Sequence, residues 1–251
     1  MTLIDPLLFA TTRVSTFTGT RSLTNASGFF FRRAKKLFLV TSRHVFLDEL
    51  RQHRPDRIEI ELHVDADNAA RSTGWSMLLY DHRRATWRQG VDQGGEVDVA
   101  AIEIEEGKLP AGTVVPAFTP HDLAGEDDEI PLGQALVIPG FPLGFHDATH
   151  HLPVTRAATL ASPWGLRFQG KGFFLTDART HSGTSGAPVV MSLQRDGLSG
   201  TPPLRWKLLG VHSSRMDMGN RDREVDEYLG LNVSWYTDIL MTLTASADGP
   251  L

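Results

Sequence analysis

Apolar residues occur along this chain in short runs that glycine, proline and charged residues interrupt. Residues 57–64 alternate strictly between polar and apolar side chains, a pattern typical of a strand with one face in solvent. Residues 29–31 and 37–40 flank the basic stretch 32–36 and predict a β-hairpin. Further runs with the composition of strands lie at residues 75–80, 97–104, 135–138, 154–160, 172–176, 187–192, 207–211 and 229–233. The pattern therefore predicts an all-β protein.

Three stretches differ in composition from these runs. Residues 117–130 contain a proline, a glycine and the acidic run 126–129, which is typical of a solvated connection between two lobes. Residues 197–203 are rich in glycine, serine and proline and predict the tip of a hairpin. Near the C-terminus, Ser234 has a side chain that favours the N-cap of a helix, and a short helix is predicted over residues 235–243.

The composition limits the classes of protein to which this chain can belong. Its 251 residues, 41% of them hydrophobic, can bury a sizeable core in one large domain or two lobes. The formal net charge of −5 gives no broad basic surface, so we expect no nucleic-acid partner. The absence of cysteine excludes disulfides and cysteine-ligated metals. Because the first ten residues lack a basic segment and no apolar run reaches about 18 residues, we expect a cytoplasmic protein without signal peptide or membrane span.

The most informative polar residue is Ser185, which has Gly183 two positions before it and Gly186 directly after it. Glycine frees the backbone to turn, so a serine there can present its hydroxyl while neighbouring N–H groups stabilise an oxyanion. A serine hydroxyl acts as a nucleophile when a base and a group that orients the base lie nearby. His44 follows an apolar strand-like run and Asp98 opens another. This order of His, Asp and Ser, each at a strand edge, predicts a catalytic triad.

Four segments taken in order resemble the trypsin-like (chymotrypsin-fold) serine proteases, most closely their bacterial HtrA-like and glutamyl-endopeptidase branches, which implies a bacterial protein. These segments are residues 26–31, 37–45, 137–144 and 175–188. The resemblance implies two six-stranded antiparallel β-barrels followed by a short C-terminal helix. It implies one peptidase domain over residues 1–251, with the first barrel in 1–118, the connection in 119–130, and the second barrel with the helix in 131–251. We expect no room for a PDZ domain after that helix.

The resemblance also implies a role for each residue of the triad. His44 corresponds to the general base, Asp98 to the residue that orients it and Ser185 to the nucleophile, while the N–H groups of Gly183 and Ser185 correspond to the oxyanion hole. The implied reaction is hydrolysis of a protein or peptide substrate through an acyl-enzyme, without a metal or organic cofactor. Thr184 replaces the usual Asp or Asn, which excludes a buried ion pair with a freed N-terminus and favours a constitutively formed site. The alternative is a catalytically silent protease-like module that binds peptides or proteins. Nothing in the sequence specifies an oligomeric state.

The residues of the substrate pocket are less strongly indicated. Glutamyl endopeptidases carry a histidine on the strand that lines the primary pocket and a Ser or Thr five residues before the nucleophile, and His212 and Thr180 hold those places. A histidine and a hydroxyl can bind a carboxylate through charge-assisted hydrogen bonds. We therefore expect Glu or another acidic residue on the acyl side of the cut, with Arg179 adding positive potential. The alternative is that His212 is a packed strand histidine and Arg179 a solvated loop residue. Ser213 corresponds to a serine that hydrogen-bonds the triad aspartate, and Arg215 stands where the family often has glycine.

Two other interpretations of short motifs are weaker. His146, His150 and His151 lie near Asp147 in one segment, but strong zinc sites have clearer spacing, which favours a polar surface loop. Ala187 holds the place of the last glycine in a Gly-x-Ser-x-Gly motif, which argues against an α/β-hydrolase.

Overall fold

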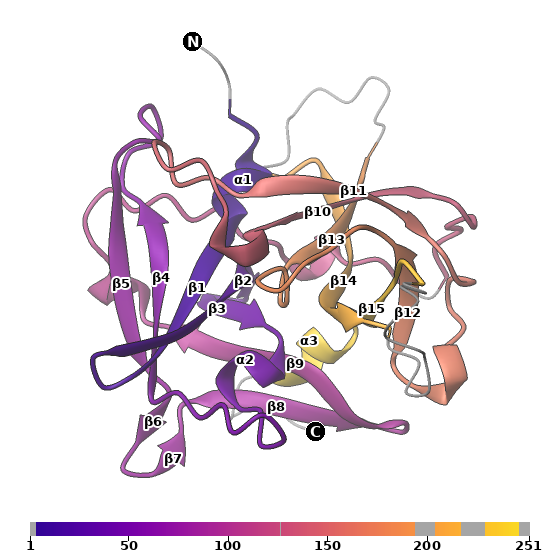
Figure 1. The fold of residues 1–251 in the computed structure, drawn as a ribbon. Coiled ribbons are helices and arrows are strands. Elements are labelled where there is room, and N and C mark those ends of the chain that lie inside the picture. The colour runs from indigo at the N-terminus through magenta and orange to yellow at the C-terminus, as the bar shows by residue number, and fades with distance from the viewer. Residues whose placement is uncertain (1–3, 126, 194–203, 217–228, 246–251) are drawn as a thin grey trace, which may run out of the picture.

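The computed structural model describes residues 4–125, 127–193, 204–216 and 229–245. Two β-structures pack against each other, one from each half of the chain (Figure 1). The first, coloured indigo to magenta, is a seven-stranded sheet, and the second, coloured salmon to yellow, is a closed barrel of six strands. The all-β prediction is confirmed, and the second half closes into the expected barrel. The first half differs from the expected six-stranded barrel because it contains seven strands in one hydrogen-bonded order.

The seven-stranded sheet is antiparallel throughout and begins near the N-terminus. Its strands lie in the spatial order β5 (Ser72–Leu78), β4 (Arg57–His63), β1 (Thr11–Thr18), β2 (Arg21–Arg33), β3 (Lys36–Thr41), β9 (Gly95–Ile104) and β8 (Trp87–Asp92). A separate ribbon is formed by β6 (Tyr80–Asp81) and β7 (Arg84–Ala85). The predicted hairpin is β2–β3. The alternation in β4 is also confirmed, because Ile58, Ile60 and Leu62 are buried while the glutamates between them are not.

The closed barrel occupies the second half of the chain. Its strands are joined in the order β10 (Ala135–Gly140), β11 (Val154–Leu160), β12 (Phe173–Asp177), β15 (Leu231–Tyr236), β14 (Trp206–Arg215) and β13 (Pro188–Ser192), and β13 pairs with β10 to close the ring. The predicted connection 119–130 lies between the last strand of the sheet and the first strand of the barrel.

The helices are short and lie outside the two β-structures. They are α1 (Pro6–Ala10), α2 (Arg43–Phe46) and α3 (Ile239–Leu243), together with the 3₁₀ turns η1 (Glu106–Lys108), η2 (Pro120–Asp122), η3 (Pro142–Gly144) and η4 (Phe168–Gly170). Within the described ranges, no helix has both the length and the apolar character needed to cross a membrane.

One hydrophobic cluster joins the two β-structures. Phe29 and Val40 from the sheet pack in the same buried cluster as Val190, Val211 and Trp235 from the barrel. Burying a large apolar side chain stabilises a fold by about 1.5–3 kcal/mol, so this shared cluster holds the two halves together. The candidate catalytic residues lie along the same junction, since they come from both halves.

The C-terminal prediction was wrong at its first residues. Ser234 does not cap a helix but lies buried inside strand β15, where it is paired with Phe174 of β12 and His212 of β14. Helix α3 begins later, with Asp238 as its N-cap residue accepting the N–H of Ile239 at 2.9 Å. Closing the barrel requires residues 231–236 as a strand, and this long-range pairing overrides the local preference of serine for an N-cap. The predicted hairpin tip at 197–203 lies outside the described residues.

Candidate active site

His44 lies in the short helix α2, directly after strand β3. Strand β3 pairs with β9 in a register that places Thr41 opposite Ala100, so the chain leaving β3 arrives beside Asp98. The Nδ1 atom of His44 lies 2.7 Å from Oδ2 of Asp98, and the backbone N–H of His44 donates to Oδ1 at 2.9 Å. Because the carboxylate faces Nδ1, that nitrogen carries the proton of the neutral ring, and Nε2 is left as the basic atom.

The carboxyl group of Asp98 is held in its ionised form by its neighbours. Burial raises the pKa of this carboxyl, but the ring and backbone N–H groups of His44 and the hydroxyl of Ser213 outweigh that effect, so the pKa lies below its usual value. The hydroxyl of Ser213 donates to Oδ2 at 2.5 Å, which is the hydrogen bond that the resemblance implied. An ionised Asp98 is the partner that an imidazolium at His44 would need.

Ser185 lies in the loop between β12 and β13, and two glycines give this loop its shape. Gly183 and Gly186 have φ values of +93° and +85°, a region that residues with a Cβ atom rarely adopt. At Gly186 a Cβ would also lie 2.1 Å from Oγ1 of Thr41 and 2.2 Å from the carbonyl oxygen of Ser27. Only glycine fits there, and its close approach brings the loop of the barrel against strands β2 and β3 of the sheet.

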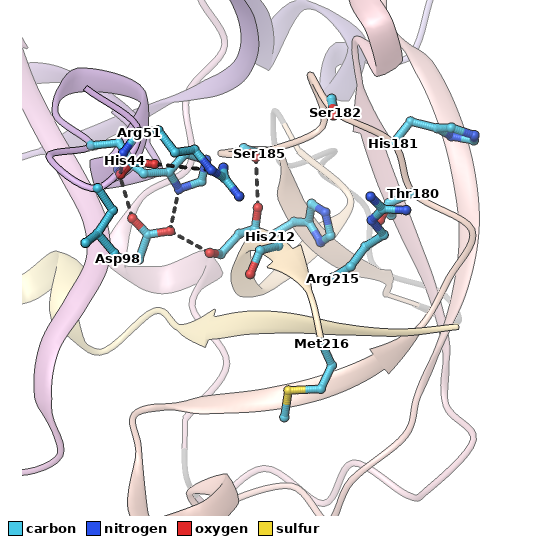
Figure 2. Close-up of a pocket in the computed structure, with 14 residues that line it drawn as sticks. His44, Arg51, Asp98, Thr180, His181, Ser182, Ser185, His212, Arg215 and Met216 are labelled. Atoms are coloured by element: carbon cyan, nitrogen blue, oxygen red, sulfur yellow. Dashed lines mark hydrogen bonds and ion pairs between the residues drawn. The ribbon is translucent and has the colours of Figure 1, made fainter. Parts of the chain in front are cut away.

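The hydroxyl of Ser185 donates to the carbonyl oxygen of Ser213 at 2.8 Å (Figure 2). In this structure it makes no hydrogen bond to the ring of His44, although both residues line the same pocket. Ser213 therefore contacts two residues of the predicted triad: its carbonyl holds Ser185, and its hydroxyl holds Asp98.

Two backbone N–H groups in this loop are available as hydrogen-bond donors. A peptide unit is planar and trans, so the carbonyl of Ser182 and the N–H of Gly183 point in opposite directions. The carbonyl of Ser182 accepts the N–H of Leu143 at 2.6 Å, which turns the N–H of Gly183 away from Leu143. Among the described residues, the N–H groups of Gly183 and Ser185 have no acceptor. Unpaired donors next to a serine hydroxyl can stabilise negative charge that develops on a bound carbonyl oxygen.

A pocket of about 460 Å³ opens beside Ser185. Three of the predicted substrate-binding residues, Thr180, His212 and Ser213, line its wall. The fourth, Arg179, is exposed and does not line it. The structure thus brings three of these side chains together around the serine and leaves Arg179 outside.

Two other arginines line the pocket in place of Arg179. These are Arg51, which follows helix α2, and Arg215, at the end of β14. Figure 2 shows the side chain of Arg215 extending toward Thr180 on the wall of the same pocket. From the sequence, Arg215 is recognised only as a departure from the glycine that the family often has at this place. A short loop that returns to the site gives no periodic signal, which is why Arg51 was missed.

The hydroxyl of Thr180 is already committed inside the protein. It donates to Oδ1 of Asn232, a buried residue of β15, at 2.6 Å. The amide nitrogen of Asn232 faces the carbonyl oxygens of Thr176, Ala178 and Gly230, so its orientation is determined by three acceptors. A hydroxyl has one proton, and Thr180 therefore has none left to donate to a ligand. Asn232 was not identified from the sequence, although an asparagine inside a predicted strand could have drawn attention to it.

His212 is buried on strand β14, with 2% of its surface exposed. Burial and the nearby charge of His44 lower the pKa of its ring to about 4, so the ring is neutral at pH 7. Its Nδ1 atom is buried and has no hydrogen-bond partner among the described residues. The environment is that of a packed strand histidine that also lines the pocket.

A family comparison supports the resemblance seen in the sequence. The model of the trypsin-like peptidase domain matches residues 26–195, which include His44, Asp98 and Ser185. The chain belongs to this family. A comparison with curated proteins found no match.

Solved structures of other proteins share the fold. A serine endoprotease from Yersinia pestis superposes with a TM-score of 0.50 at 16% identity, over 94% of this chain and 61% of the other. The scabies mite inactivated protease paralogue S-I1 gives 0.52 at 18% identity, over 94% and 92%. An inactive form of Rv3671c from M. tuberculosis gives 0.50 at 13% identity, over 99% and 94%. At these identities the comparison establishes the fold, and the present chain spans only about three fifths of the Yersinia protein.

The histidines near residue 150 of this peptidase domain form a polar loop. The rings of His146 and His151 stack with centroids 5.9 Å apart, and Nδ1 of His150 lies 2.7 Å from Asp147. No group of three or more potential metal ligands occurs in the part of the chain that the structure describes. The loop lies outside the pocket that contains Ser185.

Proposed function

We propose that this chain is a serine endopeptidase in which Ser185 is the nucleophile, His44 the general base and Asp98 the residue that orients the base. The observation that carries the proposal is the paired contact of Asp98 with His44, through the ring at 2.7 Å and the backbone at 2.9 Å, in the pocket that also contains Ser185. A carboxylate placed in this way selects the tautomer with a basic Nε2 and stabilises the imidazolium that forms during the reaction.

The proposed reaction begins with a rotation of the Ser185 side chain. Its hydroxyl leaves the carbonyl of Ser213 and donates to Nε2 of His44. As the oxygen attacks the scissile carbonyl, the proton moves to Nε2, and the N–H groups of Gly183 and Ser185 stabilise the oxyanion. The imidazolium then protonates the leaving amine, and water repeats the cycle on the acyl-enzyme with the same base.

The nucleophile can be tested by covalent labelling. A fluorophosphonate probe should label the wild-type protein and should not label Ser185→Ala. The matched control is Ser214→Ala, which removes the hydroxyl of another serine lining the pocket and should retain labelling. Labelling of Ser185→Ala, or failure to label a folded wild-type chain that also hydrolyses no peptide library, would contradict the proposal.

A second candidate function is a catalytically silent module that binds peptides. The observation in its favour is that the Ser185 hydroxyl is bonded to Ser213 and not to His44. One protein of the same fold is described as an inactivated protease paralogue, so the fold occurs without activity. Under this alternative, folded wild-type protein would bind peptides in the pocket but would neither cleave them nor react with the probe.

For specificity, we propose an acidic residue on the acyl side of the cut, with Arg215 as the cation of the pocket. The support is that Arg215 and Arg51 line the pocket while Arg179 lies outside it. In the unliganded site, the hydroxyl proton of Thr180 is already donated to Asn232, and the ring of His212 is neutral at pH 7. Thr180 therefore offers no donor to a carboxylate, and His212 offers no positive charge. A carboxylate entering this space needs a charged donor, because an unpaired buried charge is costly.

Peptides that differ only in Glu, Gln or Leu at that position test this preference. Arg215→Gln should lower kcat/KM for the Glu peptide by roughly 10- to 100-fold, the worth of one charge-assisted hydrogen bond, and should change the other two little. Arg179→Gln is the control and should leave all three values unchanged. Equal losses on the three peptides, or an equal effect of Arg179→Gln, would assign the preference elsewhere.

A further inference from the structure

A buried serine of the N-terminal sheet joins three segments around the candidate oxyanion hole. Ser27 lies on β2 and has no exposed surface. Its hydroxyl donates to the carbonyl oxygen of Gly183 at 2.8 Å and accepts the N–H of Phe141 at 3.0 Å. Its own N–H donates to the carbonyl oxygen of Ser185 at 2.9 Å. We propose that Ser27 is a positioning residue that holds the oxyanion-hole loop in its competent shape; this inference rests on the proposed peptidase function.

The hydrogen bonds of Ser27 act on the peptide units that surround the two proposed donors. The carbonyls of Gly183 and Ser185 both accept hydrogen bonds from Ser27: that of Gly183 from the hydroxyl, and that of Ser185 from the backbone N–H. Because each peptide unit is planar, fixing these carbonyls restricts the backbone rotations of Gly183 and Ser185. Gly183 needs such restriction most, since glycine adopts more backbone conformations than any other residue.

The bond to Phe141 connects the same hydroxyl to a second loop. This loop continues to Leu143, whose N–H holds the carbonyl of Ser182 at 2.6 Å and thereby sets the direction of the Gly183 N–H. A Cβ at Gly183 would lie 2.4 Å from the carbonyl oxygen of Phe141, so the two loops are already in close contact. The hydroxyl of Ser27 therefore bonds to both loops that define the orientation of one N–H group.

The side chain of Thr184, which lies in the loop between Gly183 and Ser185, does not hold the two donors in this way. Thr184 is buried between the two donors, and its hydroxyl has no hydrogen-bond partner among the described residues. The carbonyl of Ser27 is held in turn by the hydroxyl of Thr41 at 2.7 Å, which ties the arrangement to the strand that leads to His44. A neutral network from the sheet thus supports the loop of the barrel, over a sequence separation of 156 residues between Ser27 and Gly183.

The variant Ser27→Ala removes the hydroxyl and leaves the backbone bonds in place. We expect kcat to fall by roughly 10- to 100-fold with KM nearly unchanged, which is less than the 10²–10³-fold loss typical of deleting a direct oxyanion donor. The affinity for a peptide aldehyde, which forms a tetrahedral adduct, should fall by the same factor as kcat. The pH dependence of kcat should keep its midpoints, since the pair of His44 and Asp98 is untouched.

Ser162→Ala is the matched control. Ser162 is a buried serine whose hydroxyl accepts one backbone N–H, that of Leu175 at 3.0 Å, and it does not line the pocket. Its loss should lower the thermal midpoint without changing kcat. Ser27→Cys, which keeps a weak donor and acceptor on a somewhat larger atom, should lie between wild type and Ser27→Ala and replaces the alanine variant if that chain does not fold.

The outcomes separate this inference from the proposed function. If the wild type reacts with a fluorophosphonate probe and cleaves peptides, but folded Ser27→Ala or Ser27→Cys keeps the wild-type kcat and aldehyde affinity, then Ser27 is only structural and the inference is overturned. An equal loss of kcat in Ser162→Ala would overturn it as well. If the wild type neither reacts nor cleaves, the proposed function itself fails.

Discussion

The two halves of the molecule hold their parts of the candidate site in different ways. In the N-terminal sheet, His44 and Asp98 are brought together by the register of two adjacent strands, β3 and β9. In the barrel, Ser185 lies on a loop whose backbone bonds to both halves: the N–H of Gly186 donates to His212 of the barrel, and the carbonyl of Ser185 accepts the N–H of Ser27 of the sheet. The contact of His44 with Asp98 is thus positioned within one sheet, with Ser213 of the barrel as a further partner of Asp98, whereas the loop of Ser185 depends on the junction.

This difference indicates which substitutions should act locally and which should affect the whole site. A change in the pair of His44 and Asp98 should remove chemistry while the fold stays intact, because the supporting strands remain paired. A change where the loop meets the sheet should affect stability and activity together, since the shared hydrophobic cluster and the loop contacts lie along the same junction.

The largest expected effect tests whether His44 and Asp98, both from the sheet, act together as one unit. Asp98→Asn should lower kcat/KM by about 10⁴-fold, because the amide would favour the wrong tautomer of His44. His44→Ala should cost at least as much, and the double variant little more than His44→Ala alone. Steady-state kinetics on one peptide would measure this, with circular dichroism to establish folding. Additive losses, or activity in His44→Ala near wild type, would show that the two residues do not act together.

The next effect tests the junction. Gly186→Ala places a Cβ 2.1 Å from Thr41 and 2.2 Å from a backbone oxygen at a φ of +85°, and should destabilise the protein by roughly 2–5 kcal/mol. Gly133→Ala is the matched control, because Gly133 has a φ of +77° but no atom within 4 Å of its Cβ position, and it should cost about 1 kcal/mol. Urea unfolding would compare them. Similar losses in both variants would mean that the loop does not depend on close contact with the sheet.

The smallest effect compares one buried histidine from each half. The pKa of His212 is lowered to about 4 when folded, so the unfolded chain binds the extra proton between about pH 6.5 and pH 4. The contribution of the neutral His212 ring to the free energy of unfolding is therefore complete above about pH 6.5. It is lost as the pH falls toward 4, by up to about 3 kcal/mol. His212→Gln should make stability less sensitive to acid across that window.

His63 in the sheet is the comparison for His212. Burial lowers its pKa as well, but the carbonyl oxygen of His150 bonds to its ring at 2.7 Å and opposes the shift. His63→Gln should thus reduce acid sensitivity less than His212→Gln does. Urea unfolding at pH 8 and pH 5 measures how the stability of each variant changes with pH. The values at pH 8 report only the packing lost in each substitution. A steeper acid loss in His212→Gln than in wild type would show that His212 is charged in the folded protein.

The sequence by itself determined where most β-strands lie and in which order the three candidate catalytic residues follow one another along the chain. The alternation at residues 57–64 and the hairpin around the basic turn depend on neighbours within a few positions, so both are visible in a short window. The glycines around Ser185 allow the positive φ values of a single loop, and their spacing predicted Ser185 as the candidate nucleophile without any knowledge of the rest of the fold.

Only the tertiary structure decided which partners each polar group has. The proton of Thr180 is used by Asn232, 52 residues away, because barrel closure places β15 beside the loop, and the same closure turned the predicted N-cap Ser234 into a strand residue. The exclusion of Arg179 from the pocket, the presence of Arg215 and the contacts of Ser27 also depend on packing between distant segments. A hydrogen bond is determined by distances of about 3 Å in space, and separation along the chain carries almost no information about those distances.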